Sequence, residues 1–163
     1  MRKSILKLAT MSVAMSAMAI SVPAFAQDAA AEEASGPITI SGGAALVSDY
    51  RFRGVSLSDK GFALQPYLTV KHESGFYVGA WASNLSENDG DDAEVDLYVG
   101  FSGGEELTYD IGATYYVYPG VSSFNYLELT GKLGSTVGPA TVGAQLSYVP
   151  SQDNTGNTDN VYI

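Results

Sequence analysis

The connections between the alternating segments of this chain are sorted by length, and this order restricts the fold more than any other feature. In chain order they are long, short, long, short, moderate, short and long, at residues 53–60, 73–75, 85–93, 103–105, 119–123, 134–138 and 150–159. A soluble sandwich has no reason to sort its connections in this way. An outer-membrane barrel does, because every second connection is a tight periplasmic turn and the others face outward. We therefore predict an all-β fold, an antiparallel transmembrane β-barrel of the outer-membrane type.

Seven segments between these connections have the two-residue period of a strand with two different faces. Apolar residues stand at one parity and polar residues at the other. The segments suit a transmembrane strand, which has about 9–11 residues. They are residues 38–53, 62–71, 76–83, 94–102, 107–117, 127–133 and 140–148. Residues 160–163 have the pattern of the start of an eighth strand, so we predict about seven complete strands in an incomplete barrel.

A secreted antiparallel sandwich is the main alternative, because its strands also alternate apolar and polar positions. Three features favour the barrel: the segments exceed ordinary strand length, full charges occupy the polar parity, and aromatic residues stand near the segment ends, where a membrane interface favours them. Those aromatic residues are Tyr50, Phe52, Phe62, Phe76, Phe101, Tyr109 and Tyr148. Pro66 cannot donate a ladder hydrogen bond, so we expect a bulge or a pairing irregularity there.

The N-terminus has the three parts of a secretory signal peptide. Arg2, Lys3 and Lys7 supply the positive start, residues 8–22 are apolar, and residues 24–26 are an Ala-Phe-Ala cleavage site. The apolar run is shorter than the roughly 18–20 residues of a spanning helix, which argues against a membrane anchor. We expect cleavage after this leader and a location in the outer membrane of a Gram-negative bacterium.

The export signal and the strand pattern divide the chain into three parts. We expect residues 1–26 to be the cleaved signal peptide, residues 27–36 to be a disordered periplasmic tail because they have nothing large to bury, and residues 37–163 to form the barrel domain. A barrel with an open edge leaves backbone groups unpaired in lipid at several kcal/mol each, so we expect the barrel to be incomplete at its C-terminus.

Composition limits the partners. The chain has 8 Lys and Arg against 18 Asp and Glu, and removal of the three cations of the leader leaves 5 against 18, a net charge of −13. This charge argues against nucleic acid as a partner. The chain has no cysteine, which excludes disulfides and thiolate metal sites. We expect no cofactor.

The polar parity predicts which side chains line a lumen or its mouth. Hairpins centred on Ser74 and Val121 would place Lys71 opposite Tyr77, Tyr67 opposite Trp81, Asp110 opposite Lys132 and Thr114 opposite Glu128. The candidate lumen or mouth residues are Asp49, Arg51, Arg53, Gln65, Lys71, Trp81, Glu94, Asp96, Asp110, Glu128 and Lys132.

The charges of this set have two interpretations. Asp49, Arg51 and Arg53 would stand at the outer end of the first strand, at the height of Glu94 and Asp96. Opposed charges in a channel mouth set a field that sorts solutes. The alternative is an ion-pair network that stiffens a small barrel, since about eight strands leave an interior that side chains fill. The strand number of the complete barrel decides between them.

Two further features suggest no additional chemistry. The acidic run 87–92 lacks the bidentate glutamate of an EF-hand loop, so we predict a solvated surface loop, with weak divalent binding that bridges to lipopolysaccharide left open. His72 stands on the apolar parity beside a turn, whereas a catalytic histidine needs a place near its polar partners. We predict no enzymatic activity.

The runs SDYRFRGVSLSDK, residues 48–60, and HESGFYVGAWASN, residues 72–84, resemble the TorF-type porins, a family of proteobacterial proteins. The resemblance implies an outer-membrane barrel that acts as a channel, and it supplies no substrate and no catalytic residue. Members of this family generally run longer than this chain. The resemblance therefore also implies that the sequence is the N-terminal part of a longer barrel.

Together these features predict a porin, a passive diffusion channel for small hydrophilic solutes. The partners would be outer-membrane lipid, lipopolysaccharide and the solutes, with a homo-oligomer left open. The alternative function is a non-conducting structural or adhesive barrel that acts through its external loops.

Overall fold

The computed structural model describes residues 36–88 and 91–163. One antiparallel sheet contains eight strands in the order β1 (Ile38–Val47), β4 (Ala63–His72), β5 (Phe76–Asn88), β6 (Asp91–Gly103), β7 (Leu107–Val117), β8 (Tyr126–Val137), β9 (Ala140–Val149) and β10 (Asn160–Tyr162). The predicted all-β antiparallel class is confirmed, and Asn160 does begin an eighth strand. The predicted signal peptide, residues 1–26, and residues 27–35 of the predicted tail lie outside the described residues.

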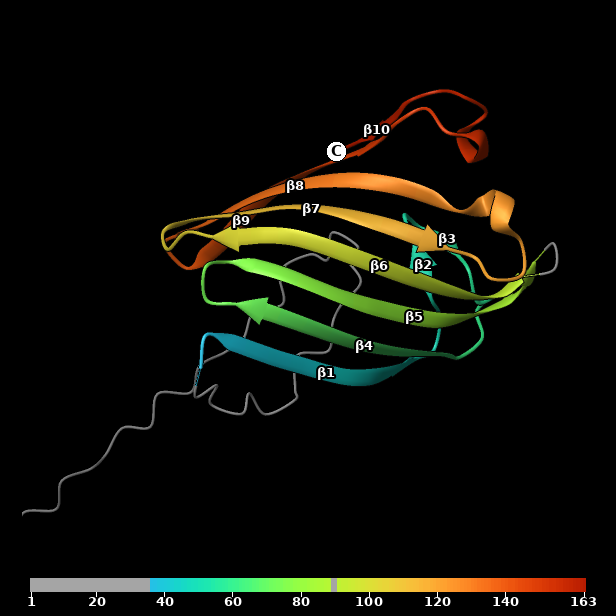
Figure 1. The fold of residues 1–163 in the computed structure, drawn as a ribbon, viewed down its shortest axis with the longest axis horizontal. Helices are drawn as coiled ribbons and strands as arrows, with labels where there is room; N and C mark the ends of the chain where they lie inside the picture. Colours follow the sequence, from blue (N-terminus) through green and yellow to red (C-terminus); the bar gives the residue numbers. More distant parts are fainter. Residues whose placement is uncertain (1–35, 89–90) are drawn as a thin grey trace, which may run out of the picture.

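A short hairpin and two helical turns complete the fold. The hairpin consists of β2 (Arg51–Phe52) and β3 (Val55–Ser56), and the 3-10 turns are η1 (Ser122–Phe124) and η2 (Asp153–Thr155). The main sheet is strongly curved, and the β2–β3 hairpin lies on one side of it (Figure 1). Within residues 36–88 and 91–163 the sheet does not close on itself, because β1 and β10 are its two edges.

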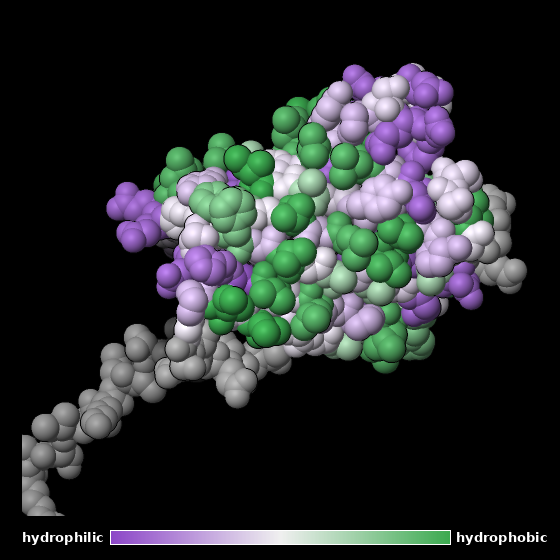
Figure 2. Space-filling model, in the orientation of Figure 1, coloured by the Kyte–Doolittle hydropathy of each residue, from purple (hydrophilic) through white to green (hydrophobic). Residues whose placement is uncertain are grey.

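Burial in the sheet is inverted relative to a water-soluble protein. On the face with the apolar parity, Leu64, Leu68 and Val78 are each 54% exposed. On the opposite face, Glu94 is 1% exposed and Glu128 is 3% exposed. Apolar side chains gather on the visible side of the sheet in Figure 2, the side opposite the hairpin. We call the apolar side the outer face and the polar side, which carries the hairpin, the inner face.

The connections alternate between the two ends of the sheet, and the predicted sorting by length holds for all of them except the connection between β5 and β6, where Asn88 already pairs with Asp91. The turns at 73–75, 104–106 and 138–139 lie at one end, together with the start of β1, and we call this the short-turn end (Figure 1). The connections 48–62, 118–125 and 150–159 lie at the other end, which we call the long-connection end.

Two of the predicted connections are wrong in detail. Residues 85–93 were expected to form a long connection, but β5 and β6 pair Asn84 with Ala93 and Asn88 with Asp91, with a register shift between these pairs. The turn expected at 134–138 lies at 138–139, because β8 continues and pairs Thr136 with Thr141. Both segments are rich in residues that favour turns. Backbone pairing with the neighbouring strand outweighs that local preference.

The predicted register is correct in both hairpins that the sequence allowed us to align. The Cα partners are Lys71 and Tyr77, Tyr67 and Trp81, Asp110 and Lys132, and Thr114 and Glu128. Because a slip of one residue would exchange the two faces, the agreement confirms that the paired residues of each hairpin share one face.

Pro66 produces the pairing irregularity that its missing N–H predicts. The β4–β5 ladder begins at Tyr67 and does not include Pro66. Beyond it, the Asn84 side chain replaces the ladder: its Oδ1 accepts the Leu64 N–H at 2.7 Å, and its Nδ2 donates to the Phe62 carbonyl at 3.2 Å. Strand β5 can therefore separate from β4 at the long-connection end without leaving the Leu64 N–H unpaired.

Within the described part of the chain, no helix is long and apolar enough to cross a membrane.

Candidate functional site

The candidate site is built by a hairpin that leaves the edge of the sheet and folds onto its inner face. Strand β1 ends at Val47, so the predicted continuation through Arg53 is wrong. The two-residue turn Arg53-Gly54 has φ values of 49° and 86°, as in the type I′ turns that match strand twist. This turn reverses the chain and creates β2 and β3. An Arg-Gly pair between apolar residues is the sequence signal that could have predicted the hairpin.

Backbone hydrogen bonds fix the position of the hairpin. The Tyr50 N–H donates to Ser58 Oγ at 2.8 Å, and the Leu57 N–H donates to the Tyr50 carbonyl at 2.8 Å. The Ser86 N–H at the end of β5 donates to the Leu57 carbonyl at 2.9 Å. The first two bonds close the base of the hairpin, and the bond from Ser86 attaches it to β5.

The sequence placed Tyr50 on the wrong face, and also Phe52, whose ring packs against that of Tyr116 at 5.9 Å. Tyr50 shows the difference most clearly. It was expected at a membrane interface on the outer face, but it is buried on the inner face, where its hydroxyl lies 3.2 and 3.3 Å from the two carboxylate oxygens of Glu94. Its ring packs against Trp81 at a centroid distance of 5.3 Å. Burial, followed by the charge of Glu94, raises the pKa of Tyr50 above its usual range, so the hydroxyl stays protonated and donates.

Arg53 connects the hairpin to the opposite side of the sheet. Its guanidinium forms an ion pair with Glu128 of β8. The same group lies 4.6 Å from the ring centre of Phe52 and 4.6 Å from that of Tyr162 in β10. Arg53 is thus a cation held by one carboxylate and two aromatic rings.

Arg51 and Asp49 lie apart from this arrangement. Arg51 Nε donates to Asp49 Oδ2 at 2.6 Å, and the Arg51 side chain is about half exposed. A hydrogen bond from Ser56 Oγ at 2.5 Å is the largest cause that lowers the pKa of Asp49. The predicted place of both residues in the first strand is therefore wrong, because β1 ends at Val47 and both lie in the connection that follows it.

Three carboxylates and four aromatic rings form a cluster at the long-connection end of the inner face, and Arg53 contacts it through Glu128. The carboxylates are Glu94, Asp96 and Glu128, and the buried or half-buried rings are Tyr50, Trp81, Tyr116 and Tyr126. The rings of Tyr116 and Tyr126 stack at 4.3 Å with an angle of 8°. Asp96 Oδ1 is buried and has no hydrogen-bond partner among the described residues. We call this set the inner acidic site.

The other predicted inward residues line the same face. Near the inner acidic site, Gln65 Nε2 donates to Ser83 Oγ at 3.4 Å. Toward the short-turn end, Lys71 Nζ donates to Ser102 Oγ at 2.9 Å, and the Tyr77 hydroxyl donates to Asp110 Oδ1 at 2.9 Å. The Cα of Lys132 stands opposite Asp110, as predicted. Acidic side chains thus predominate at the long-connection end, and both inward lysines lie toward the other end.

A separate cavity of about 300 Å³ lies among the connections at the long-connection end. Its lining is aromatic and aliphatic, with three polar side chains: Val55, Ser56, Leu57, Leu85, Ser86, Tyr118, Phe124, Tyr126 and Asn154. Tyr126 belongs both to this cavity and to the inner acidic site, so the two are adjacent.

His72 lies apart from the inner acidic site, next to the turn at the short-turn end. His72 is exposed, and its Nδ1 lies 2.8 Å from Ser74 Oγ in the turn. Among the described residues, no group of His, Cys, Asp and Glu side chains is arranged to hold a metal ion. Within the acidic run 87–92, residues 89–90 lie outside the described residues.

Comparison with known proteins places most of the chain in a family. A family model described as a bacterial protein of unknown function (Gcw_chp) matches residues 31–163. No curated protein and no solved structure matches the chain.

Proposed function

We propose that this chain, which belongs to the Gcw_chp family of bacterial proteins of unknown function, forms the wall of an outer-membrane β-barrel that acts as a porin. Small hydrophilic solutes would diffuse passively along its inner face. Outer-membrane lipid and lipopolysaccharide would contact its outer face. The likeness of residues 48–60 and 72–84 to TorF-type porins, and the predicted export signal at residues 1–26, support the same proposal.

The single observation that carries the proposal is the inverted burial. Large apolar side chains cover the outer face, and charged side chains are buried on the inner face. In water, each exposed Leu or Ile on that face would forgo about 1.5–3 kcal/mol of burial free energy. An apolar patch of this extent on a protein marks a protein or membrane contact. Lipid would cover the apolar side chains of the whole face and so remove the free-energy cost of their exposure to water. A protein partner of ordinary size would cover only part of the curved sheet.

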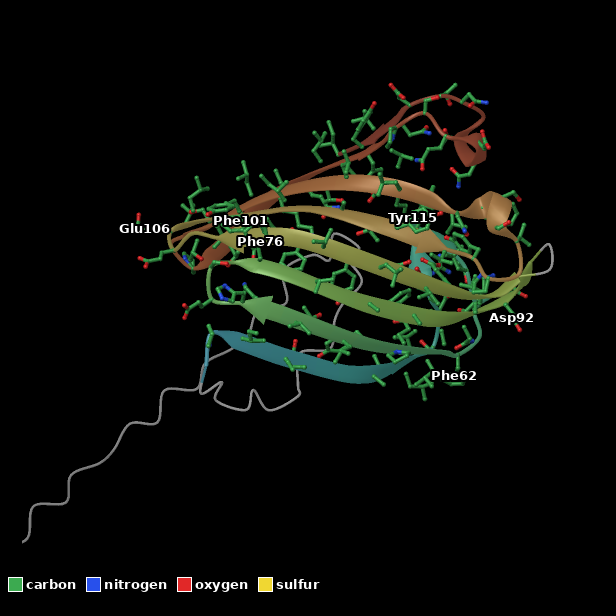
Figure 3. The ribbon with its side chains drawn as sticks, in the orientation of Figure 1. Phe62, Phe76, Asp92, Phe101, Glu106 and Tyr115 are labelled. Atoms are coloured by element: carbon green, nitrogen blue, oxygen red, sulfur yellow. The ribbon has the colours of Figure 1, made fainter. Side chains whose placement is uncertain are left out.

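Aromatic side chains lie at both limits of the outer face, as in the girdles of membrane barrels. Phe76 and Phe101 pack at 4.9 Å near the short-turn end, and Phe62 lies at the long-connection end (Figure 3). Strand β4 between these levels has 10 residues, a length of about 33 Å. At a strand tilt of about 40° this gives a height of about 25 Å, which matches the apolar band of outer-membrane barrels.

The properties of the inner face favour a conducting channel over a barrel whose interior is filled by side chains. It is polar along the whole length of the strands, and the β2–β3 hairpin lies on it near one end only. A segment folded onto the inner wall narrows a lumen locally, where charged side chains can act on a passing solute at short range. A homo-oligomer is compatible with this arrangement.

A non-conducting barrel that acts through its connections is the second candidate. Two observations favour it: the hairpin and the inner acidic site fill part of the inner face, and the cavity of about 300 Å³ opens among the long connections. Such a barrel would bind or adhere at its external end and pass no solute.

Single-channel recording of the full-length protein in planar bilayers tests the proposal. We expect discrete steps of current in potassium chloride. A folded, membrane-inserted protein that produces no current at any voltage would contradict the porin and favour the second candidate.

A further inference from the structure

The cavity among the long connections is built from four separate segments of the chain. They are the β2–β3 hairpin with Leu57, the end of β5, the connection 118–125 with the start of β8, and η2. Hydrogen bonds join these segments in pairs: Ser86 Oγ donates to the Leu57 carbonyl at 3.2 Å, and Asn154 Nδ2 donates to the Phe124 carbonyl at 2.9 Å. The cavity is therefore formed before any ligand arrives, as most ligand sites are.

Aromatic rings give the cavity flat apolar walls whose positions are fixed by packing. The ring of Tyr126 stacks on that of Tyr116 at 4.3 Å, and Phe124 packs edge-on against Tyr118 at 6.2 Å. Val55 and Phe124 are nevertheless 64% and 37% exposed. Both lie outside the strands of the main sheet, so lipid on the outer face would not cover them. A ligand with apolar C–H groups in the cavity would.

The polar groups of the cavity have hydrogen-bonding capacity that the protein does not use. Within residues 36–88 and 91–163, the Tyr126 hydroxyl forms no hydrogen bond, and Asn154 Oδ1 accepts none. Ser86 Oγ donates to Leu57 and can still accept. Polar groups that are shielded from bulk water need a partner, so these groups favour a ligand that both donates and accepts.

The charge of the lining restricts the ligand further. The described side chains that line the cavity are all neutral. An ionised ligand would lose its hydration there and find no opposite charge, which is unfavourable. A pure hydrocarbon would leave the Tyr126 hydroxyl and Asn154 Oδ1 without partners. The remaining class is a neutral molecule that has apolar faces and a hydroxylated rim.

We propose that this cavity binds a neutral pyranose ring, from a free saccharide or from lipopolysaccharide. The C–H groups on the faces of a pyranose suit aromatic rings, whose faces carry partial negative charge. Its hydroxyls suit Tyr126, Ser86 and Asn154, because each hydroxyl both donates and accepts. The volume of about 300 Å³ lies at the lower limit of ligand sites, so the cavity holds one sugar ring. Binding at this place requires no conduction.

Saturation-transfer NMR tests the inference on the full-length protein in phosphatidylcholine nanodiscs that contain no lipopolysaccharide. The probes are the methyl α-D-pyranosides of glucose, galactose and mannose, which differ in the orientation of single hydroxyls. At least one should receive saturation at its ring protons. Mannitol, which has the hydroxyls without a ring, and p-cresol, a flat ring with one hydroxyl, should receive much less. Added lipopolysaccharide that abolishes the signal would assign the ring to lipopolysaccharide, and a signal that persists would assign it to a free saccharide.

Three variants locate the binding. Tyr126→Phe should weaken it about three- to tenfold, the effect of one lost hydrogen bond, and should leave the unfolding temperature unchanged, because that hydroxyl bonds to no other described group. Val55→Trp, at an exposed position, should fill the cavity and abolish binding. Tyr115→Phe on the outer face is the matched control and should change neither property.

Several results would overturn the inference. One is a folded wild-type protein that transfers saturation to none of the three pyranosides, and another is transfer to mannitol or p-cresol that equals or exceeds transfer to the sugars. Sugar binding that is the same in Tyr126→Phe, Val55→Trp and wild type would place the sugar elsewhere. Each of these results leaves the porin intact, because single-channel recording tests conduction separately. The comparison of probes on the wild-type protein stands even if a variant does not fold.

Discussion

At the scale of single residues, the fold depends on polar groups that are buried together. Tyr50 shows this most directly, because it combines an aromatic ring packed on Trp81 with a hydroxyl that donates to Glu94. A buried carboxylate that loses a donor keeps its desolvation cost and gains nothing in return. We therefore expect the loss of a single hydrogen-bonding group on the inner face to lower stability, although few apolar side chains pack there.

Replacement of Tyr50 by Phe tests this dependence. The ring contact with Trp81 stays, and the hydrogen bond to Glu94 is lost, so we expect the free energy of unfolding to fall by about 1–3 kcal/mol. Urea titration of the protein folded in lipid vesicles measures the change. Tyr115→Phe on the outer face, where the side chain is 43% exposed, is the control and should have little effect. An equal loss in both variants would mean that the Tyr50 hydroxyl does not stabilise the site.

At the scale of strands, close contacts between glycine and tyrosine shape the inner face. Gly79 stands directly opposite Tyr98 in the β5–β6 pair. A Cβ atom at Gly79 would lie 2.5 Å from the Tyr98 ring and 2.5 Å from the Leu68 carbonyl oxygen. The Tyr98 hydroxyl, which lies 2.5 Å from Thr69 Oγ1, holds the ring in this position. The glycine thus makes room for a tyrosine that reaches across β5 to β4.

The change Gly79→Ala should therefore destabilise the protein by about 1–3 kcal/mol, the usual cost of overpacking. Gly131→Ala is a matched control in the middle of β8, since no atom lies within 4 Å of a Cβ there. The control should be neutral or slightly stabilising, because alanine restricts the unfolded chain. Thermal unfolding of both variants in the same lipid measures the difference, and a Gly79→Ala protein as stable as the control would contradict the contact argument.

The two faces of a strand should also differ in their tolerance of charge. Val99→Arg on the outer face should cost roughly 2–4 kcal/mol if the position lies near the bilayer midplane. Thr130→Arg on the inner face, next to Glu128, should cost far less. Folding yield into vesicles of defined thickness compares the two. Equal sensitivity would mean that the outer face does not contact lipid.

The strands and their faces could be predicted from the sequence, whereas the site could be predicted only in part. Period-two alternation identified all the strands of the main sheet, and Asp110 and Lys132 were paired correctly, because parity and turn position are local properties. The ion pair of Arg53 with Glu128 joins residues 75 positions apart, and it depends on the reversal at Arg53-Gly54. Alternation continues through that reversal, so parity assigned Tyr50 and Arg53 to a strand that ends at Val47.

At the scale of the whole molecule, the sorted connections set an orientation that can be measured. The three short turns and the start of β1 lie at one end of the sheet, and the long connections lie at the other. Outer-membrane barrels keep short turns in the periplasm and expose longer loops. A chain whose N-terminus stays in the periplasm after export also has to begin its first strand at the periplasmic end, and β1 begins at the end with the short turns. If the chain forms such a barrel, both considerations predict that Ser74 faces the periplasm and Asn154 faces the cell exterior.

Single cysteines test this orientation cleanly, because the chain has no cysteine of its own. On intact cells, Asn154→Cys should react with a membrane-impermeant maleimide, and Ser74→Cys should react only after the outer membrane is permeabilised. Ser74 is exposed in its turn. A slow reaction at this position would therefore be caused by the membrane barrier and not by burial in the protein. Labelling of Ser74→Cys on intact cells, with Asn154→Cys protected, would invert the topology. The inner acidic site would then lie nearer the periplasm than the cell exterior.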